Sequence, residues 1–131
     1  MQFMSLEWLE AYGSTLNNDA VIAKKLKKFS SSFQYSITDR KDIEPIVMKV
    51  EKGVCVEFET FSNTTAKKID FSVSANTQSW KKVFSHEMNL KEIMSNDGFQ
   101  FKGPKLKALS NKAGLERSVE LMLNMKDVTV E

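Results

Sequence analysis

Few side chains in this sequence could take part in covalent catalysis. His86 is the single histidine and Cys55 the single cysteine. A thiol attacks a substrate only when a base lies within hydrogen-bonding reach. The alternating pattern around Cys55 predicts a position on the outward face of a strand, away from the helical layer. One histidine and one cysteine are also too few for a typical zinc site. We therefore expect neither a Cys–His nucleophile nor a metal centre.

Paired carboxylates are the remaining route to acid–base chemistry. Glu57 and Glu59 share one face of a predicted strand, but that face is the solvated one, so we interpret them as surface side chains. The sequence has no glycine-rich phosphate loop and no nucleophile elbow. The residues that an enzyme would have to use are Tyr12, Tyr35, His86 and Asp97. We expect a protein that is not an enzyme and that needs no cofactor.

The overall composition is that of one globular domain. The chain has 131 residues, of which 41% are hydrophobic and 27% are charged, so we expect residues 1–131 to form a single domain. A net charge of +2 is too small for a nucleic-acid-binding surface. No run approaches the roughly 20 apolar residues of a membrane span. The N-terminus lacks the basic start of a secretory signal, so we expect a cytoplasmic location.

Four lysines lie close together in a predicted amphipathic helix. They are Lys24, Lys25, Lys27 and Lys28. Such a group could make transient contact with anionic lipid headgroups, or it could be only the solvated side of the helix. The sequence leaves both interpretations open.

Five short segments alternate between apolar and polar side chains with a period of two, which is typical of strands with one buried face. The positions expected to face the core are Phe33, Tyr35, Ile37, Ile46, Met48, Val50, Val54, Val56, Phe58, Ile69, Phe71, Val73, Ala75, Phe99 and Phe101. Because most intervening positions are polar, we expect a mostly antiparallel sheet with one side open to solvent. Short connections between the first four segments predict a meander.

Helical periodicity fills the segments on either side of these strands. The predicted helices begin after Ser5, after Asp19, at Ser79, at residue 90 and at Lys105, and Gly114 interrupts the last one. The expected fold is therefore α+β, a two-layer sandwich with a five-stranded sheet and all helices packed on one face. The end of the last helix is apolar on more than one side, so it must cover a ligand, a partner or a second subunit. The residues concerned are Leu121, Met122, Leu123 and Met125.

The stretch from Ile69 to Leu123 carries a family resemblance. It contains an alternating strand, a helix with Trp80, the strand Gly98-Phe99-Gln100-Phe101-Lys102-Gly103 and a long amphipathic helix. In this order of elements it resembles the C-terminal half of the sterol carrier protein (sterol-transfer) family. The resemblance implies an apolar tunnel between the sheet and its helices. It also implies non-covalent binding of a fatty acyl chain, a sterol or a similar lipid.

Our leading hypothesis is a non-catalytic carrier whose apolar ligand lies between sheet and helices. The residues expected to line the pocket are Tyr35, Met48, Phe58, Phe71, Trp80, Phe84, Phe101, Leu109, Val119 and Met122. The alternative is a protein-interaction or homo-oligomerisation module, such as a homodimer, that uses the apolar C-terminal helix and has no physiological small ligand. An enzyme, or an accessory domain that presents a ligand to one, is the third hypothesis.

Overall fold

The computed structural model describes residues 1–64, 68–85, 87, 92 and 98–130. The elements in chain order are α1 (Leu6–Asn17), α2 (Ala20–Lys25), β1 (Ser31–Ile37), β2 (Ile46–Glu51), β3 (Val54–Thr60), the 3₁₀ helix η1 (Phe61–Asn63), β4 (Phe71–Ala75), α3 (Thr77–Phe84), β5 (Phe99–Lys102), α5 (Lys105–Ser110) and α6 (Lys112–Leu123). His86, Asp97 and the short helix predicted at residues 90–94 lie outside the described residues. In the described part of the chain, no helix is long and apolar enough to cross a membrane.

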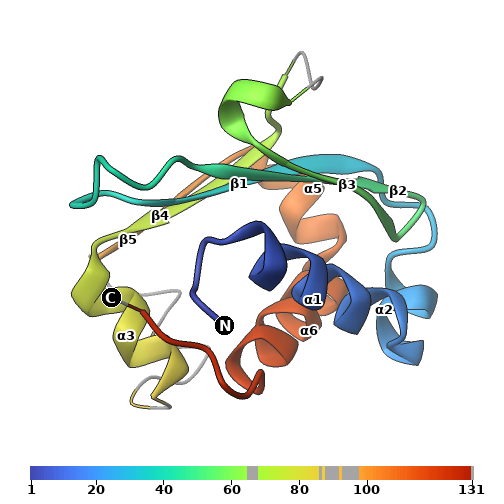
Figure 1. The fold of residues 1–131 in the computed structure, drawn as a ribbon. Coiled ribbons are helices and arrows are strands. Elements are labelled where there is room, and N and C mark those ends of the chain that lie inside the picture. The colour runs from blue at the N-terminus through green and yellow to red at the C-terminus, as the bar shows by residue number, and fades with distance from the viewer. Residues whose placement is uncertain (65–67, 86, 88–91, 93–97, 131) are drawn as a thin grey trace.

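The five strands form one sheet in the order β3-β2-β1-β4-β5. Figure 1 shows the α-helices on one face of this sheet and η1 on the other. Three of the four strand pairs are antiparallel, which confirms the predicted two-layer α+β fold with a mostly antiparallel sheet.

The predicted meander is wrong, because β4 pairs with β1 in parallel instead of with β3. β4 follows β3 in the chain but lies on the far side of β1 in the sheet. Ser32 of β1 binds the end of the connection between these two strands. The Ser32 hydroxyl donates to the Lys68 carbonyl at 2.7 Å and accepts from the Asp70 N–H at 3.0 Å. These two bonds place β4 beside β1, with Phe71 opposite Phe33. Short connections favour sequential pairing, but the polar contacts of Ser32 are long-range and leave no local signal.

A β-bulge in β3 reverses the faces that simple alternation predicts for the first half of this strand. The β3 side of the pairing with β2 gains one residue between Cys55 and Phe58. The predicted inward positions Val54 and Val56 are therefore exposed, whereas Cys55 is buried. Asn17 at the end of α1 holds the bulge, since its side chain accepts from the Cys55 N–H at 2.8 Å and donates to the Cys55 carbonyl at 3.1 Å.

The first helices begin where the sequence predicts. The Ser5 side chain accepts from the Trp8 N–H at 3.1 Å, and the Asp19 side chain accepts from the Ile22 N–H at 3.0 Å, so both residues cap orphan donors. α2 ends at Lys25, so the predicted helix is short and two of its four lysines, Lys27 and Lys28, follow it in the segment that leads into β1.

The long helix predicted from Lys105 is two helices, and the break lies at Asn111 instead of Gly114. Gly114 has a packing role. A Cβ atom at this position would lie 2.3 Å from Cδ2 of Leu26, which follows α2. The missing side chain therefore lets α6 approach α2 closely.

The two ends of the chain meet in a short parallel bridge between Gln2 and Thr129. The Phe3 N–H donates to the Thr129 carbonyl, and the Thr129 N–H donates to the Met1 carbonyl, each at 2.8 Å. Phe3 is fully buried, with its ring 4.7 Å from Trp8 and 4.6 Å from Trp80 between centroids. The bridge thus holds an aromatic side chain in the core.

The apolar end of α6 packs against the protein's own core. Leu121, Leu123 and Met125 are half-buried there, and Met122 is buried. The apolar side chains at the end of this helix therefore need no partner or second subunit to cover them, because other parts of the same chain do so.

Candidate functional site

A cavity of about 340 Å³ lies between the β1–β4–β5 part of the sheet and the helices α3, α5 and α6. Aromatic and aliphatic side chains make up most of its wall. The described residues that line it are Tyr12, Phe33, Tyr35, Phe71, Ser72, Val73, Trp80, Val83, Phe99, Phe101, Lys102, Gly103, Lys105, Ala108, Leu109, Lys112, Leu115, Glu116, Ser118, Val119 and Met122. Leu109 lines the cavity and is also 68% exposed, so the cavity opens beside α5.

Most of the predicted pocket residues come together around this cavity. Those that line it are Tyr35, Phe71, Trp80, Phe101, Leu109, Val119 and Met122. Three others lie elsewhere. Met48 is buried under the far half of the sheet, Phe58 contacts the α1 position Gly13, and Phe84 packs at 5.0 Å from Phe3 between ring centroids. α1 covers β2 and β3, so the inward side chains of those strands fill the core and leave only about 20 Å³ there.

Several lining residues were not among the predicted ones. Phe33, Val73 and Phe99 belong to the same inward strand face as their predicted neighbours, so the alternation alone could have identified them. The charged lining residues Lys102, Lys105, Lys112 and Glu116 carry no comparable local signal. They reach the cavity only because β5, α5 and the start of α6 meet at its mouth.

Trp80 fixes one wall of the cavity. Its indole Nε1–H donates to the Ser36 carbonyl at 3.0 Å, which satisfies the polar atom of an otherwise apolar side chain. The ring meets Phe99 of β5 edge-on, at 5.2 Å between centroids. Asn76 caps the helix that carries Trp80 by accepting from the Ser79 N–H at 2.8 Å. This part of the wall is therefore fixed by the hydrogen bond to β1, by the cap of α3 and by the ring contact with Phe99.

Two tyrosines supply the buried polar groups of the cavity. The Tyr12 hydroxyl donates to the Ser118 carbonyl of α6 at 3.0 Å, and its ring meets the Tyr35 ring edge-on, at 6.3 Å between centroids. Burial raises the pKa of both phenols above their ordinary range, so both stay protonated at neutral pH. They can orient a polar group of a ligand by hydrogen bonding, but they are poor general bases.

Cys55 does not supply a reactive thiol. Burial raises its pKa to about 11, so the thiolate that would act as nucleophile is scarce at neutral pH. Its inward position near the tyrosines differs from the outward one predicted from the alternation, because of the bulge in β3. Among the residues that the structure describes, no group of three His, Cys, Asp or Glu side chains is placed to hold a metal ion.

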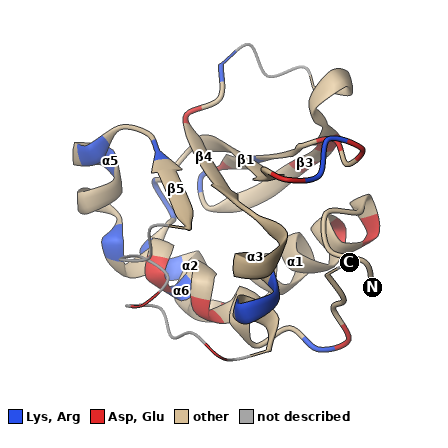
Figure 2. Cartoon of the chain, turned by 90° about the vertical axis from the view of Figure 1, so that its left-hand side faces the viewer, with Lys and Arg blue, Asp and Glu red and all other residues tan. Residues whose placement is uncertain are grey.

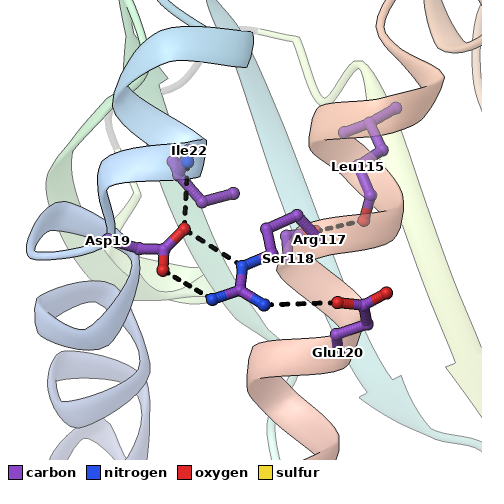
Figure 3. Close-up of polar contacts among 6 residues, drawn as sticks. All are labelled: Asp19, Ile22, Leu115, Arg117, Ser118 and Glu120. Carbon is purple, nitrogen blue, oxygen red and sulfur yellow. Dashed lines mark hydrogen bonds and ion pairs between the residues drawn. The ribbon is translucent and has the colours of Figure 1, made fainter.

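An ion pair positions α6, which forms one wall of the cavity. Arg117 donates to both carboxylate oxygens of Asp19, at 2.8 Å from Nη2 to Oδ1 and 3.2 Å from Nε to Oδ2. Its remaining nitrogen Nη1 donates to Glu120 at 3.3 Å. Figure 3 shows Asp19 bound at once by Arg117 and by the Ile22 N–H at the start of α2. One carboxylate thus caps α2 and ties it to α6.

Replacing Asp19 by Asn should separate these two roles. Asn caps a helix as well as Asp does, so Asp19→Asn keeps the cap and loses the ion pair, whereas Asp19→Ala loses both. We expect the free energy of unfolding at pH 7 to fall in the order wild type, Asn, Ala, as measured by urea denaturation.

The same comparison has a defined pH dependence. The hydrogen bond from Arg117 is the main reason that the pKa of Asp19 is lowered in the folded state. Stabilisation by a lowered pKa is present above the ordinary carboxyl pKa and is lost as the pH falls through the folded-state value. The difference between wild type and Asp19→Asn should therefore shrink in acid. A difference that stays constant with pH would contradict the ion-pair explanation.

Solved structures with the same architecture include sterol carrier proteins. A crystal structure of sterol carrier protein 2 superposes with a TM-score of 0.75 at 16% identity, over 94% of this chain and 98% of that one. The apo form of sterol carrier protein 2 from Yarrowia lipolytica gives a TM-score of 0.54 at 12% identity, over 90% and 91% of the two chains. These identities establish the shared fold.

The same fold also occurs as part of a larger enzyme. A double mutant of the sec-alkyl sulfatase PisA1 gives a TM-score of 0.56 at 12% identity, over 87% of this chain but only 15% of that chain. Curated proteins include no match to this sequence. The family model of the SCP-2 sterol transfer family matches residues 10–116, a span that reaches from α1 into α6. This span includes every strand and most of the cavity wall, and the chain belongs to the SCP-2 sterol transfer family.

Proposed function

We propose that this protein binds and carries one apolar molecule, with a fatty acyl chain as the preferred ligand. The observation that carries the proposal is the apolar cavity between the sheet and α3, α5 and α6. Burying apolar surface there provides about 25 cal/mol per Å² before ordering costs. Membership of the SCP-2 sterol transfer family supports lipid binding in general.

The size of the cavity favours a slender ligand. Pockets for small molecules measure about 300–1,000 Å³, and this cavity of about 340 Å³ lies near the lower end of that range. A single alkyl chain has a narrow cross-section and enough flexibility to follow a wall made of rings and branched side chains. We therefore place an acyl chain ahead of a bulkier sterol.

The charges at the mouth favour an acidic headgroup. Lys102, Lys105 and Lys112 line the mouth, and Glu116, the one acidic side chain among the described lining residues, lies 3.6 Å from the Lys112 ammonium. A carboxylate at this position would gain charge-assisted contacts while its chain lies inside. The buried hydroxyls of Tyr12 and Tyr35 can donate a hydrogen bond to, or accept one from, a second polar group of the ligand deeper in the cavity.

Titration with a fluorescent fatty acid tests the proposal. Delipidated protein should bind the acid with saturation near one molecule per chain. Lys102→Gln combined with Lys105→Gln should weaken binding of the acid several-fold and leave the matching fatty alcohol almost unaffected. Lys24→Gln combined with Lys25→Gln is the charge-matched control, because these exposed lysines lie outside the cavity. Absence of binding across acyl and sterol probes would sink the proposal.

Other predictions from the sequence stay untested by the fold. They are the cytoplasmic location, the lack of an enzymatic activity, transient membrane contact through Lys24, Lys25, Lys27 and Lys28, and a homodimer. All four lysines are exposed, on α2 or just after it. Light scattering tests the predicted homodimer, and a molar mass that stays at the monomer value at every protein concentration would contradict it.

A further inference from the structure

The two most exposed large apolar side chains of the described residues lie on one short helix beside the mouth of the cavity. Leu106 is 81% exposed and Leu109 is 68% exposed, both on α5. Phe101, on the neighbouring edge strand β5, is 42% exposed. A protein rarely leaves two leucines of one short helix in water without a partner. We call these three side chains, with the nearby lysines Lys102, Lys105, Lys107 and Lys112, the α5 face.

The charge of the α5 face is mainly positive. Residues 98–115 contain its four lysines and no Asp or Glu, and Glu116, the next residue, lies 3.6 Å from Lys112. Figure 2 shows α5 beside β5 at one side of the molecule, with basic but no acidic residues along it. Lys107 is anchored, since its ammonium donates to the Ser30 carbonyl at 2.6 Å and lies 5.3 Å from the centre of the Phe29 ring. Lys102, Lys105 and Lys112 are exposed.

The α5 face also forms part of the cavity wall. Ala108 and Leu109 line the cavity, and α5 itself runs only from Lys105 to Ser110. The helix lies between Gly103 and the break at Asn111. Whatever binds the α5 face therefore lies beside the opening of the cavity.

We propose that the α5 face docks on an anionic membrane surface, with Leu106 and Leu109 in the apolar boundary layer and the lysines among the headgroups. Apolar side chains surrounded by lysines are typical of helices that lie in the membrane interface. A second copy of this chain fits poorly, because a symmetric dimer would place the same lysines against each other. Docking places the mouth of the cavity directly against the lipid from which a ligand would be loaded.

An environment-sensitive dye at position 106 reports docking directly. Leu106→Cys in a Cys55→Ala background is labelled with a nitrobenzoxadiazole dye and mixed with phosphatidylcholine vesicles, with and without phosphatidylserine. The emission should shift to the blue and brighten with phosphatidylserine vesicles. The matched control is Val54→Cys in the same background, because Val54 is 50% exposed on β3 at the opposite edge of the sheet. An equal response at both positions, or none at position 106, overturns the proposal.

Unlabelled variants separate docking from ligand binding. Leu106→Ser should lower cosedimentation with phosphatidylserine vesicles by about tenfold, since one leucine no longer leaves water. Val54→Ser should have no effect. Leu106 does not line the cavity, so the fatty-acid affinity of Leu106→Ser in solution should equal that of wild type. The docking result is thus independent of whether the proposed ligand is correct.

The four lysines on α2 or just after it are the competing candidate for a membrane surface. If Lys24→Gln combined with Lys25→Gln abolishes vesicle binding while Leu106→Ser retains it fully, the α5 face is not the docking surface and the proposal fails. A dye response at position 106 that grows with protein concentration in the absence of vesicles indicates self-association, and it also overturns the proposal. Vesicle binding lost in Leu106→Ser and retained in the α2 variant supports it.

Discussion

Ala108→Trp is expected to weaken fatty-acid binding by at least about tenfold. Ala108 lines the cavity from α5, so an indole at this position can enter a space of about 340 Å³. The added ring would occupy the volume that a ligand chain needs. Titration with the fluorescent fatty acid measures the effect, and thermal unfolding followed by circular dichroism shows that the fold is retained.

Ala113→Trp is the matched control for this substitution. Ala113 is exposed at the start of α6 and does not line the cavity, so the same change in size and chemistry leaves the cavity free. Its affinity should equal that of wild type. Full affinity in Ala108→Trp would mean that the ligand occupies another part of the protein, and equal losses in both variants would point to a general effect of surface tryptophan.

Gly53→Ala is expected to destabilise the fold by about 2 kcal/mol or more. Gly53 has a φ of +79° in the turn between β2 and β3, a conformation that costs a side-chain-bearing residue energy. A Cβ atom would also lie 2.6 Å from the Leu26 carbonyl oxygen, a backbone atom that cannot rotate away. The Gly53 N–H donates to the Phe29 carbonyl at 2.9 Å, which explains why the two backbones run so close. Urea denaturation measures the loss.

Lys52→Asn should act in the opposite direction at the adjacent position. Lys52 also has a positive φ, of 49°, and it is exposed. Asn tolerates this conformation better than Lys, and Asn-Gly is a favoured pair in two-residue hairpin turns. The midpoint of urea denaturation should therefore rise slightly. A loss of stability equal to that of Gly53→Ala would show that the turn conformation differs from the one described.

Local signals in the sequence were sufficient for most of the elements. Period-two alternation identified all five strands, and Ser5 and Asp19 identified the starts of two helices, because a capping side chain acts within three residues. Such features depend only on residues that are close together in the sequence, so the sequence alone is enough to predict them.

The errors all involve partners that are far apart in the sequence. The bulge at Cys55 is held by Asn17, and the parallel pairing of β4 is held by Ser32 with Lys68 and Asp70, each 36 or 38 residues away. Single-sequence periodicity cannot register such contacts. Gly114 was interpreted as a bend for the same reason, whereas its role is to accommodate Leu26.

The candidate site could be predicted in part because a sheet face is a shared property of its strands. Inward residues of β1, β4 and β5 line the cavity as the alternation requires. Met48 and Phe58 obey the same alternation but lie under α1. Only the position of that helix shows where side chains fill the space between the layers and where a cavity remains. The charged mouth was missed entirely, because Lys102, Lys105 and Lys112 look like ordinary surface residues until β5, α5 and α6 are seen together.

The bridge between the two ends of the chain imposes an order on folding during synthesis. Residue 1 bonds residue 127, and the 125 positions between them take roughly 6–25 s to be synthesised. Until then the backbone N–H of Phe3 lacks its Thr129 partner, although Trp8 and Trp80 are already available to its ring. The corner that holds Phe3 can therefore close only after all five strands have been synthesised.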